Sequence, residues 1–200
     1  IGLAKTDEQN LDLLNDIVGG LQAADVDSIA KINELARIAN AIQSVAATGT
    51  STPALTPADF VAVGLSGVTT DNLPAVLAAI GGKNNEGTET DSLSKLQTVI
   101  TTTAASQTAA INLIGTYAEA NTLSAPTAPT GTAPGTTDFS AAGVTGVDSN
   151  NLTAINDALA TAAVNGAAAN TTAKVQAIVN AFNAILALSL IHISEPTRQA

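Results

Sequence analysis

Three segments of this sequence align with one another, and this internal repetition constrains the fold more than any other feature. In each segment a glycine followed by an apolar residue precedes an Asn-Leu pair, in residues 2–11, 64–73 and 143–152. The leucines of the pairs are Leu11, Leu73 and Leu152, so the second interval between copies is longer than the first. Self-similarity of this kind is the sequence signature of repeat architectures. We therefore expect tandem modules.

The second and third copies match over a longer stretch than the first. Asp59-Phe60 aligns with Asp138-Phe139, and Gly67-Val68 aligns with Gly146-Val147. The first copy begins at its own glycine and lacks the Asp-Phe pair. We interpret the chain as an internal fragment that starts within a repeat.

Each copy predicts a first helix, because apolar residues recur at i, i+3 and i+7 after the Asn-Leu pair. An oxygen-bearing side chain precedes each of these runs and can cap a helix: Asp7, Thr69 and Asp148. Pro74 lies in the predicted first turn, and Gly81-Gly82 marks the end of that helix. The predicted inward residues are Leu11, Leu14 and Val18; Leu73, Val76 and Ile80; and Leu152, Ile155 and Leu159.

A second helix is predicted in each copy, with start signals at Asp27, Asp91 or Thr171 and with Lys31, Lys95 and Lys174 in register. Its inward face carries Ile32, Leu35 and Ile42 in the first copy, and Val175, Ile178, Phe182 and Ile185 in the third. The second copy is longer, and we assign the excess to an additional helix over residues 106–120, with Ile111, Ile114 and Tyr117 on one face.

Two stretches rich in Pro, Thr, Gly and Ala separate the copies, and such compositions favour extended linkers without a packed core. The predicted fold is therefore all-α, with small helical-bundle modules in tandem joined by Pro/Thr-rich linkers. The predicted boundaries are a partial repeat at 1–48, a linker at 49–57, a repeat with an extra helix at 58–121, a linker at 122–137, a repeat at 138–188 and a tail at 189–200.

The charge and composition exclude several classes of function. The formal net charge is −10 and only seven residues are Lys or Arg, which argues against nucleic-acid binding. The longest apolar run, residues 184–193, is too short to span a bilayer, so we expect no membrane insertion. No signal peptide is visible, and we expect any export signal to lie outside this sequence.

The candidate chemical residues all have simpler explanations. His192 is the only histidine and there is no cysteine, so no metal set or catalytic triad can be assembled. Residues 86–91 match a calcium loop only weakly and fit a solvated loop and helix cap better. The Gly-x-x-Gly turns suit a tight corner, and Asn10, Asn72 and Asn151 suit local backbone hydrogen bonds. We predict no catalytic, cofactor-binding or metal residue, no cofactor, and no enzymatic activity.

The repeat resembles a known kind of module. The unit Asp138-Phe139, Gly143, Gly146-Val147, Asn151-Leu152 and Lys174-Val175-Gln176 is similar to modules repeated in very large secreted adhesin-like proteins of Gram-negative bacteria. Residues 117–121, followed by a Pro-Thr stretch, look like the joint between such modules. The resemblance covers residues 1–188, and it departs at Lys5, where the other copies have Gly67 and Gly146.

The C-terminal residues differ from everything before them. Residues 189–198, Ser-Leu-Ile-His-Ile-Ser-Glu-Pro-Thr-Arg, resemble a translated sequencing-adapter string. They fall outside the repeat pattern and hold the sole histidine and one of the two arginines. We predict that this tail is not native to the protein.

The resemblance implies a structural spacer in a bacterial protein that is secreted or displayed on the cell surface, with neighbouring repeats of the same chain as its partners. Two other hypotheses remain open. A helical binding module for a host or matrix protein requires an exposed repeated patch. A filament subunit would share the Ala, Thr and Asn bias of this chain.

Overall fold

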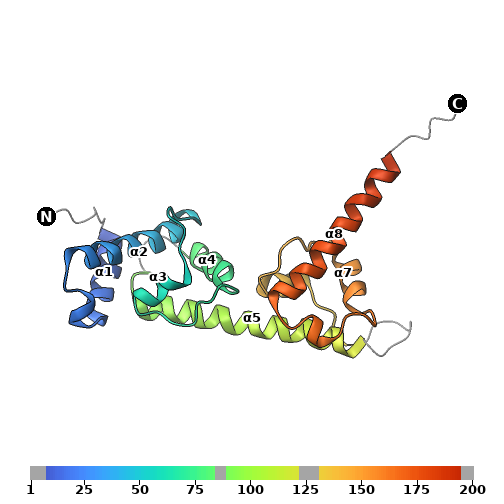
Figure 1. The fold of residues 1–200 in the computed structure, drawn as a ribbon, viewed down its shortest axis with the longest axis horizontal. Coiled ribbons are helices and arrows are strands. Elements are labelled where there is room, and N and C mark those ends of the chain that lie inside the picture. The colour runs from blue at the N-terminus through green and yellow to red at the C-terminus, as the bar shows by residue number, and fades with distance from the viewer. Residues whose placement is uncertain (1–7, 84–88, 122–130, 195–200) are drawn as a thin grey trace. The chain divides into compact units, whose positions relative to one another are not determined.

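The computed structural model describes residues 8–83, 89–121 and 131–194, and every regular element in these ranges is helical (Figure 1). Side chains are described for residues 11–83, 89–121 and 131–188. The prediction of an all-α fold is confirmed. The α-helices are α1 Glu8–Gly20, α2 Ile29–Thr48, α3 Pro57–Ala62, α4 Leu73–Gly81, α5 Leu93–Asn121, α6 Thr136–Ala141, α7 Leu152–Leu159 and α8 Thr172–Ser194, with 3-10 turns η1 Ala23–Asp25 and η2 Gly166–Ala168.

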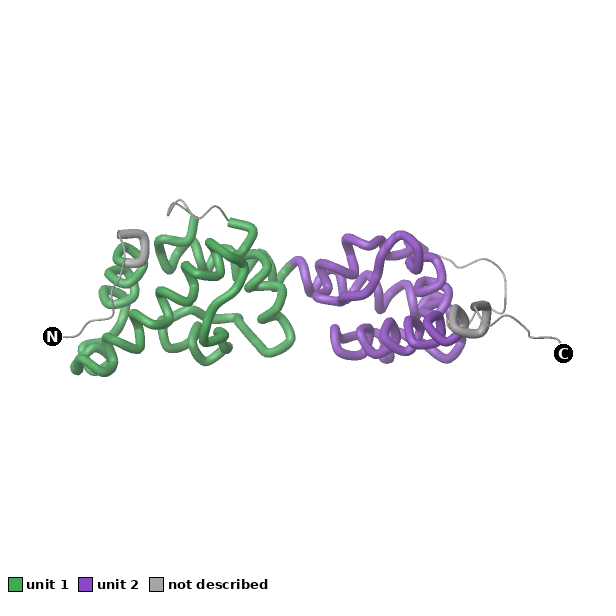
Figure 2. Tube along the Cα trace, turned by 90° about the horizontal axis from the view of Figure 1, so that it is seen from above, with its two compact units in different colours: residues 1–105 green, residues 106–200 purple. Residues whose placement is uncertain are grey.

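The chain divides into two compact units, unit 1 at residues 1–105 and unit 2 at residues 106–200 (Figure 2). The division falls inside α5, which is one continuous helix. The expected separate helix over 106–120 is therefore wrong, because that stretch is the C-terminal part of α5. Between Leu93 and Ile114 the sequence contains neither Gly nor Pro, so nothing interrupts the helix there.

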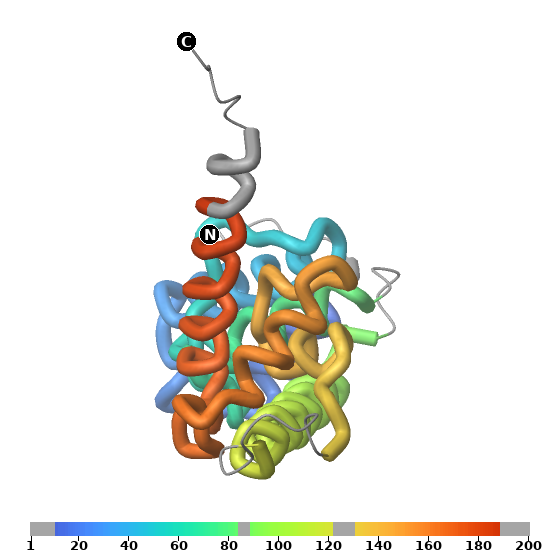
Figure 3. Tube along the Cα trace, turned by 90° about the vertical axis from the view of Figure 1, so that its right-hand side faces the viewer, coloured from blue at the N-terminus to red at the C-terminus, as the bar shows by residue number. Residues whose placement is uncertain are grey.

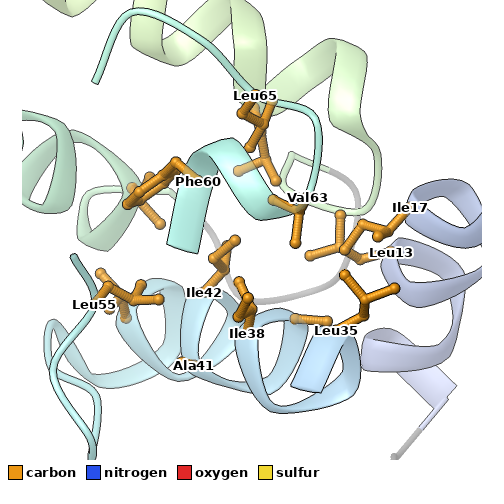
Figure 4. Close-up of a cluster of buried hydrophobic side chains, with 14 of the residues drawn as sticks. Leu13, Ile17, Leu35, Ile38, Ala41, Ile42, Leu55, Phe60, Val63 and Leu65 are labelled. Atoms are coloured by element: carbon orange, nitrogen blue, oxygen red, sulfur yellow. The ribbon is translucent and has the colours of Figure 1, made fainter. Parts of the chain in front are cut away.

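Unit 1 is built around α2. Helix α1 packs against α2, and α2 packs against α3 and α4. Figure 4 shows Phe60 and Val63, from α3 and its end, facing Ile38 and Ile42 of α2 across the core. The N-terminal part of α5 adds Leu96 to the same cluster. Burial of these apolar side chains is the main stabilising term for the unit.

The predicted inward face of the first helix is confirmed for Leu14, which is buried, and for Val18, which packs against the core, but it is wrong for Leu11. Leu11 is 44% exposed, whereas Leu13 and Ile17 are fully buried and Leu14 is buried beside them. Helix α1 begins at Glu8, so Asn10 lies inside the helix and does not precede it as Asn72 and Asn151 precede theirs. The apolar stripe that meets α2 is centred on Leu13 and Ile17, a spacing of one helical turn.

Unit 2 combines the C-terminal part of α5 with α6, α7 and α8. Ile114 and Tyr117 of α5 pack with Phe139 of α6, and α7 packs against α8. In Figure 3 the red turns of α8 extend beyond the orange part of the unit. Helix α7 has 8 residues and α8 has 23, lengths of roughly 12 and 35 Å. The long helix therefore outruns its partner, and Ile185, predicted to point inward, is 64% exposed.

The buried positions of unit 1 recur in unit 2 at the interval that separates Leu73 from Leu152. Phe60 and Phe139 are the largest of them, and both are fully buried. The pattern extends through three pairs of matching helices, α3 with α6, α4 with α7 and α5 with α8, with the same interval at every position. The buried pairs are Phe60 and Phe139, Val63 and Ala142, Leu65 and Val144, Val76 and Ile155, Ile80 and Leu159, Leu96 and Val175, and Ile100 and Val179.

The first expected linker is described in full by the structure, and the second is described only in part. Residues 49–57 were expected to lack a packed core, yet Leu55 is buried in the core of unit 1. Thr56 then caps α3 and Pro57 is its first residue. Residues 122–130 of the second linker lie outside the described residues. The tail predicted at 189–200 begins within α8, whose backbone is helical to Ser194.

Candidate functional site

The Gly-x-x-Gly turns follow the short helices α3 and α6 and are the most closely repeated local structures. Gly64 and Gly67 have φ of 85° and 86°, and Gly143 and Gly146 have φ of 75° and 80°. Left-handed backbone of this kind strains any residue with a Cβ. The interpretation of the glycines as conformational residues in a tight corner is confirmed.

A glutamine holds each turn to the following long helix. The Ser66 N–H donates to Oε1 of Gln97 at 3.0 Å, and Nε2 of Gln97 donates to the Ser66 carbonyl at 3.0 Å. In unit 2 the Thr145 N–H donates to Gln176 at 2.8 Å, and Gln176 donates back at 3.0 Å. Each side-chain amide thus satisfies one backbone donor and one backbone acceptor of the turn.

An asparagine closes the other end of each turn. Asn72 donates to the Gly67 carbonyl at 2.7 Å and accepts from the Thr69 N–H at 2.7 Å. Asn151 likewise donates to the Gly146 carbonyl at 2.8 Å and accepts from the Asp148 N–H at 2.8 Å. The prediction of local backbone hydrogen bonds is confirmed for both residues. The side chain of Asn10 and the cap proposed at Asp7 lie outside the described residues.

The long helices α2, α5 and α8 begin with the same hydroxyl-to-lysine hydrogen bond. The backbone N–H of Lys31 donates to Ser28, that of Lys95 to Ser92 and that of Lys174 to Thr171, at 3.3, 3.4 and 3.3 Å. The start signals proposed at Asp27 and Asp91 are therefore one residue early. These carboxylates instead form i,i+4 ion pairs with the lysine ammonium groups, at 2.9 and 2.7 Å.

Unit 1 also contains an ion cluster that the sequence analysis missed. Arg37 of α2 bonds Glu34 at 2.7 Å and also pairs with Asp59 of α3. The hydrogen bond from Arg37 lowers the pKa of Glu34. Burial opposes ionisation of Asp59, but hydrogen bonds from Thr56 and Arg37 outweigh it, so the pKa of Asp59 is also lowered. Asp138 repeats the capping bond of Asp59, to the Gly135 N–H, but the position matching Arg37 is Thr101 in α5.

Replacing Arg37 with glutamine is expected to reduce the acid sensitivity of the protein. Because the pKa values of Glu34 and Asp59 are lowered in the folded state, the two carboxylates stabilise the fold at neutral pH. This stabilisation is lost as the pH falls through their folded-state pKa values. We expect Arg37→Gln to cost on the order of 1 kcal/mol at pH 7 and less at pH 3. Urea unfolding followed by circular dichroism at both pH values measures this, and an equal loss at both would contradict the assignment.

Unit 2 has an open surface pocket of about 330 Å³ beside the C-terminal part of α5. Its walls are mainly apolar, with amide and hydroxyl groups but no carboxylate, ammonium, guanidinium or imidazole. Burial raises the pKa of Tyr117, and the negative charge of Asp157 adds to this. The amide and hydroxyl groups that line the pocket can donate and accept hydrogen bonds, but they supply no acid–base pair near neutral pH. The lining residues are Asn112, Leu113, Thr116, Tyr117, Ala120, Gly131 and Thr132.

The remaining candidates do not come together as a chemical site in the described part of the chain. Among the side chains described, those of residues 11–83, 89–121 and 131–188, no three from His, Cys, Asp or Glu are grouped to hold a metal ion. Within the weak calcium-loop match, residues 86–88 lie outside the described residues, and Asp91 is paired with Lys95. The side chain of His192 also lies outside them.

No protein-family model, no curated protein and no solved structure matches this chain. Within the described residues, none of the helices has the length and apolar character required to cross a membrane. The recurring polar side chains of the described residues bond backbone groups of turns and helix ends, an arrangement that fixes structure.

Proposed function

We propose that the chain consists of tandem helical modules that act as a structural spacer in an extracellular, adhesin-like protein of bacteria. In this proposal each module comprises a short entry helix, a Gly-x-x-Gly turn, a second helix and the start of a long helix. The Pro/Thr-rich stretches join the modules, and neighbouring repeats of the same chain are the main partners. The protein performs no catalysis itself.

The observation that carries the proposal is the recurrence of one set of contacts at one fixed interval along the chain. Gln97 and Gln176 bond equivalent turns, and Asn72 and Asn151 close them. The core pair Phe60 and Phe139 obeys the same interval. Repetition of whole contact networks favours a protein whose length is the selected property, because modules that contact only their neighbours can be added in series.

Composition supports placement of the protein outside the cell. Only 12% of the residues are charged, and Thr, Ser, Asn and Gln make up most of the polar residues. The absence of cysteine is compatible with export, since nothing in the chain requires oxidative folding. Assignment to an adhesin-like protein rests on the resemblance of the repeated motif.

Small-angle X-ray scattering tests the spacer function. A compact globule of this chain length has a radius of gyration of roughly 16 Å. A spacer is expected to exceed that value clearly, and its maximum dimension is expected to grow in proportion when one further repeat is added. A radius of gyration near the compact value would contradict the proposal. So would a maximum dimension that does not grow in proportion to chain length when the repeat is added. Dilution over a wide concentration range is the control, because a concentration-independent radius excludes association as the cause.

A further inference from the structure

We propose that the C-terminal half of α8 is a docking face for one further helical module of this chain's own type, bound through an α3-like entry helix. This inference deepens the proposed spacer function and rests on it, because it names the partner of an exposed surface. The surface consists of Ile185 and Leu188, which are 64% and 61% exposed.

The long helices can be compared position by position because their first turns are anchored alike. Ser28, Ser92 and Thr171 each accept the backbone N–H three positions later. With these caps aligned, Ile185 and Leu188 of α8 fall on Ile42 and Val45 of α2. The comparison therefore needs no assumption about where each helix ends.

At the matching positions of α2 the same kind of residue is covered. Ile42 and Val45 are 0% and 1% exposed. Figure 4 shows Ile42 pointing toward α3, near Phe60 and Val63. In unit 1 this part of the long helix is thus covered by the module that follows it in the chain. Helix α3 lies over Ile42, and α4 also packs against α2, with Gly81 close to the Val45 carbonyl.

In contrast to α2, the two matching positions of helix α5 are exposed. Its residues at these two positions are Ser106 and Ala109, and both are exposed. Small side chains are therefore found where these positions are open to solvent, and large aliphatic side chains are found where α3 and α4 of the following module cover them. Ile185 and Leu188 belong to the second kind, although the described residues around them leave them open. Exposed aliphatic side chains side by side on one helix face are typical of interaction sites.

The chemistry of the surface fits an apolar entry helix. From Val175 to Leu188 the sequence of α8 contains no charged residue. The entry helix α3 presents Phe60, which is fully buried, and its N-terminus is closed by a Thr56–Asp59 capping box. In α3 Asp59 also pairs with Arg37. In unit 2, however, Asp138 of α6 keeps the capping bond although the position matching Arg37 is Thr101, so an entry helix can be capped and can bury its phenylalanine without that ion pair.

A cysteine accessibility experiment tests the inference, since the chain has no native cysteine. Leu188 stands in the register of Val45, so residues 1–188 can be continued directly by a copy of residues 46–105. Ile185→Cys is placed in the original full-length chain and in this extended chain, and labelling by a soluble disulfide reagent is timed. Ser106→Cys is the matched control, expected to react equally fast in both.

We expect Ile185→Cys to react at least about tenfold more slowly in the extended chain. Phe60→Asp in the appended copy is expected to restore fast labelling, because it removes the buried anchor. Equal labelling rates in the two chains would overturn the proposal. So would protection in the original chain that rises with protein concentration, since a second copy would then be the occupant. Scattering decides the spacer function separately, because a compact particle can still protect the cysteine.

Discussion

Replacing Phe139 with alanine is expected to lower the free energy of unfolding of unit 2 by about 3–5 kcal/mol. Phe139 is fully buried and packs with Tyr117, so the substitution leaves a cavity in a core built mostly of smaller side chains. Tyr117 is the only tyrosine and there is no tryptophan, so its fluorescence reports on unit 2 during urea unfolding. The Tyr117 transition is expected to shift to lower urea.

The matching substitution in unit 1, Phe60→Ala, is expected to cost a similar amount, because Phe60 is buried to the same extent. Val61→Ala is the control in the same helix, since Val61 is 65% exposed, and its effect is expected to stay within about 0.5 kcal/mol. The account is contradicted if Phe139→Ala unfolds at the same urea concentration as the parent. A large loss from Val61→Ala would contradict it as well.

Replacing Gly146 with alanine is expected to destabilise unit 2 by about 1–2 kcal/mol or more. Its φ of 80° is unfavourable for a residue with a Cβ, and an added Cβ would lie 3.1 Å from Nδ2 of Asn183. Gly67→Ala in unit 1 meets the same backbone strain, but its nearest neighbour, Ile100, is an ordinary 3.6 Å away. The excess loss at Gly146 over Gly67 therefore measures the steric contribution of Asn183.

Gly19→Ala is a control whose effect on the free energy of unfolding is expected to have the opposite sign. Gly19 is in the last turn of α1, and an added Cβ would meet nothing within 4 Å. Alanine there is expected to stabilise the protein by up to about 1 kcal/mol, because it lowers the entropy of the unfolded chain. Thermal unfolding by circular dichroism compares the three variants. If Gly67→Ala and Gly146→Ala stabilised the protein as Gly19→Ala is expected to do, the turn geometry assigned to Gly67 and Gly146 would be wrong.

Sequence periodicity predicted α4 and α7 well, since their signals are local. Val76 and Ile80, like Ile155 and Leu159, are buried as the i+3 and i+7 spacing required. Pro74 lies in the first turn of α4, and the helix ends at Gly81 with Gly82 as its C-cap, as expected. In α1 the same template placed Leu14 and Val18 correctly but included the exposed Leu11 and missed Leu13 and Ile17. The consecutive apolar residues Leu13 and Leu14 allow two neighbouring helix faces, and packing against α2 centres the buried face on Leu13 and Ile17.

The properties that depend on tertiary contacts were the ones that the sequence could not predict. The continuity of α5 depends on a polar Thr- and Ala-rich run, and the two ends of this helix belong to the cores of the two units. The pairing of Arg37 with Asp59 joins residues far apart in the sequence, and no local pattern indicates it. The Lys-x-Gln signature was visible, but only the structure identifies Gln97 and Gln176 as partners of the turns.

Hydrogen exchange at the Ser66 and Thr145 amides tests most directly whether one motif makes one contact in both units. These amides donate to Gln97 and Gln176 at 3.0 and 2.8 Å. We expect both to be protected in the parent protein. Gln97→Ala is expected to release Ser66 alone, and Gln176→Ala is expected to release Thr145 alone. Fast exchange of either amide in the parent, or protection that survives loss of its own glutamine, would contradict the account.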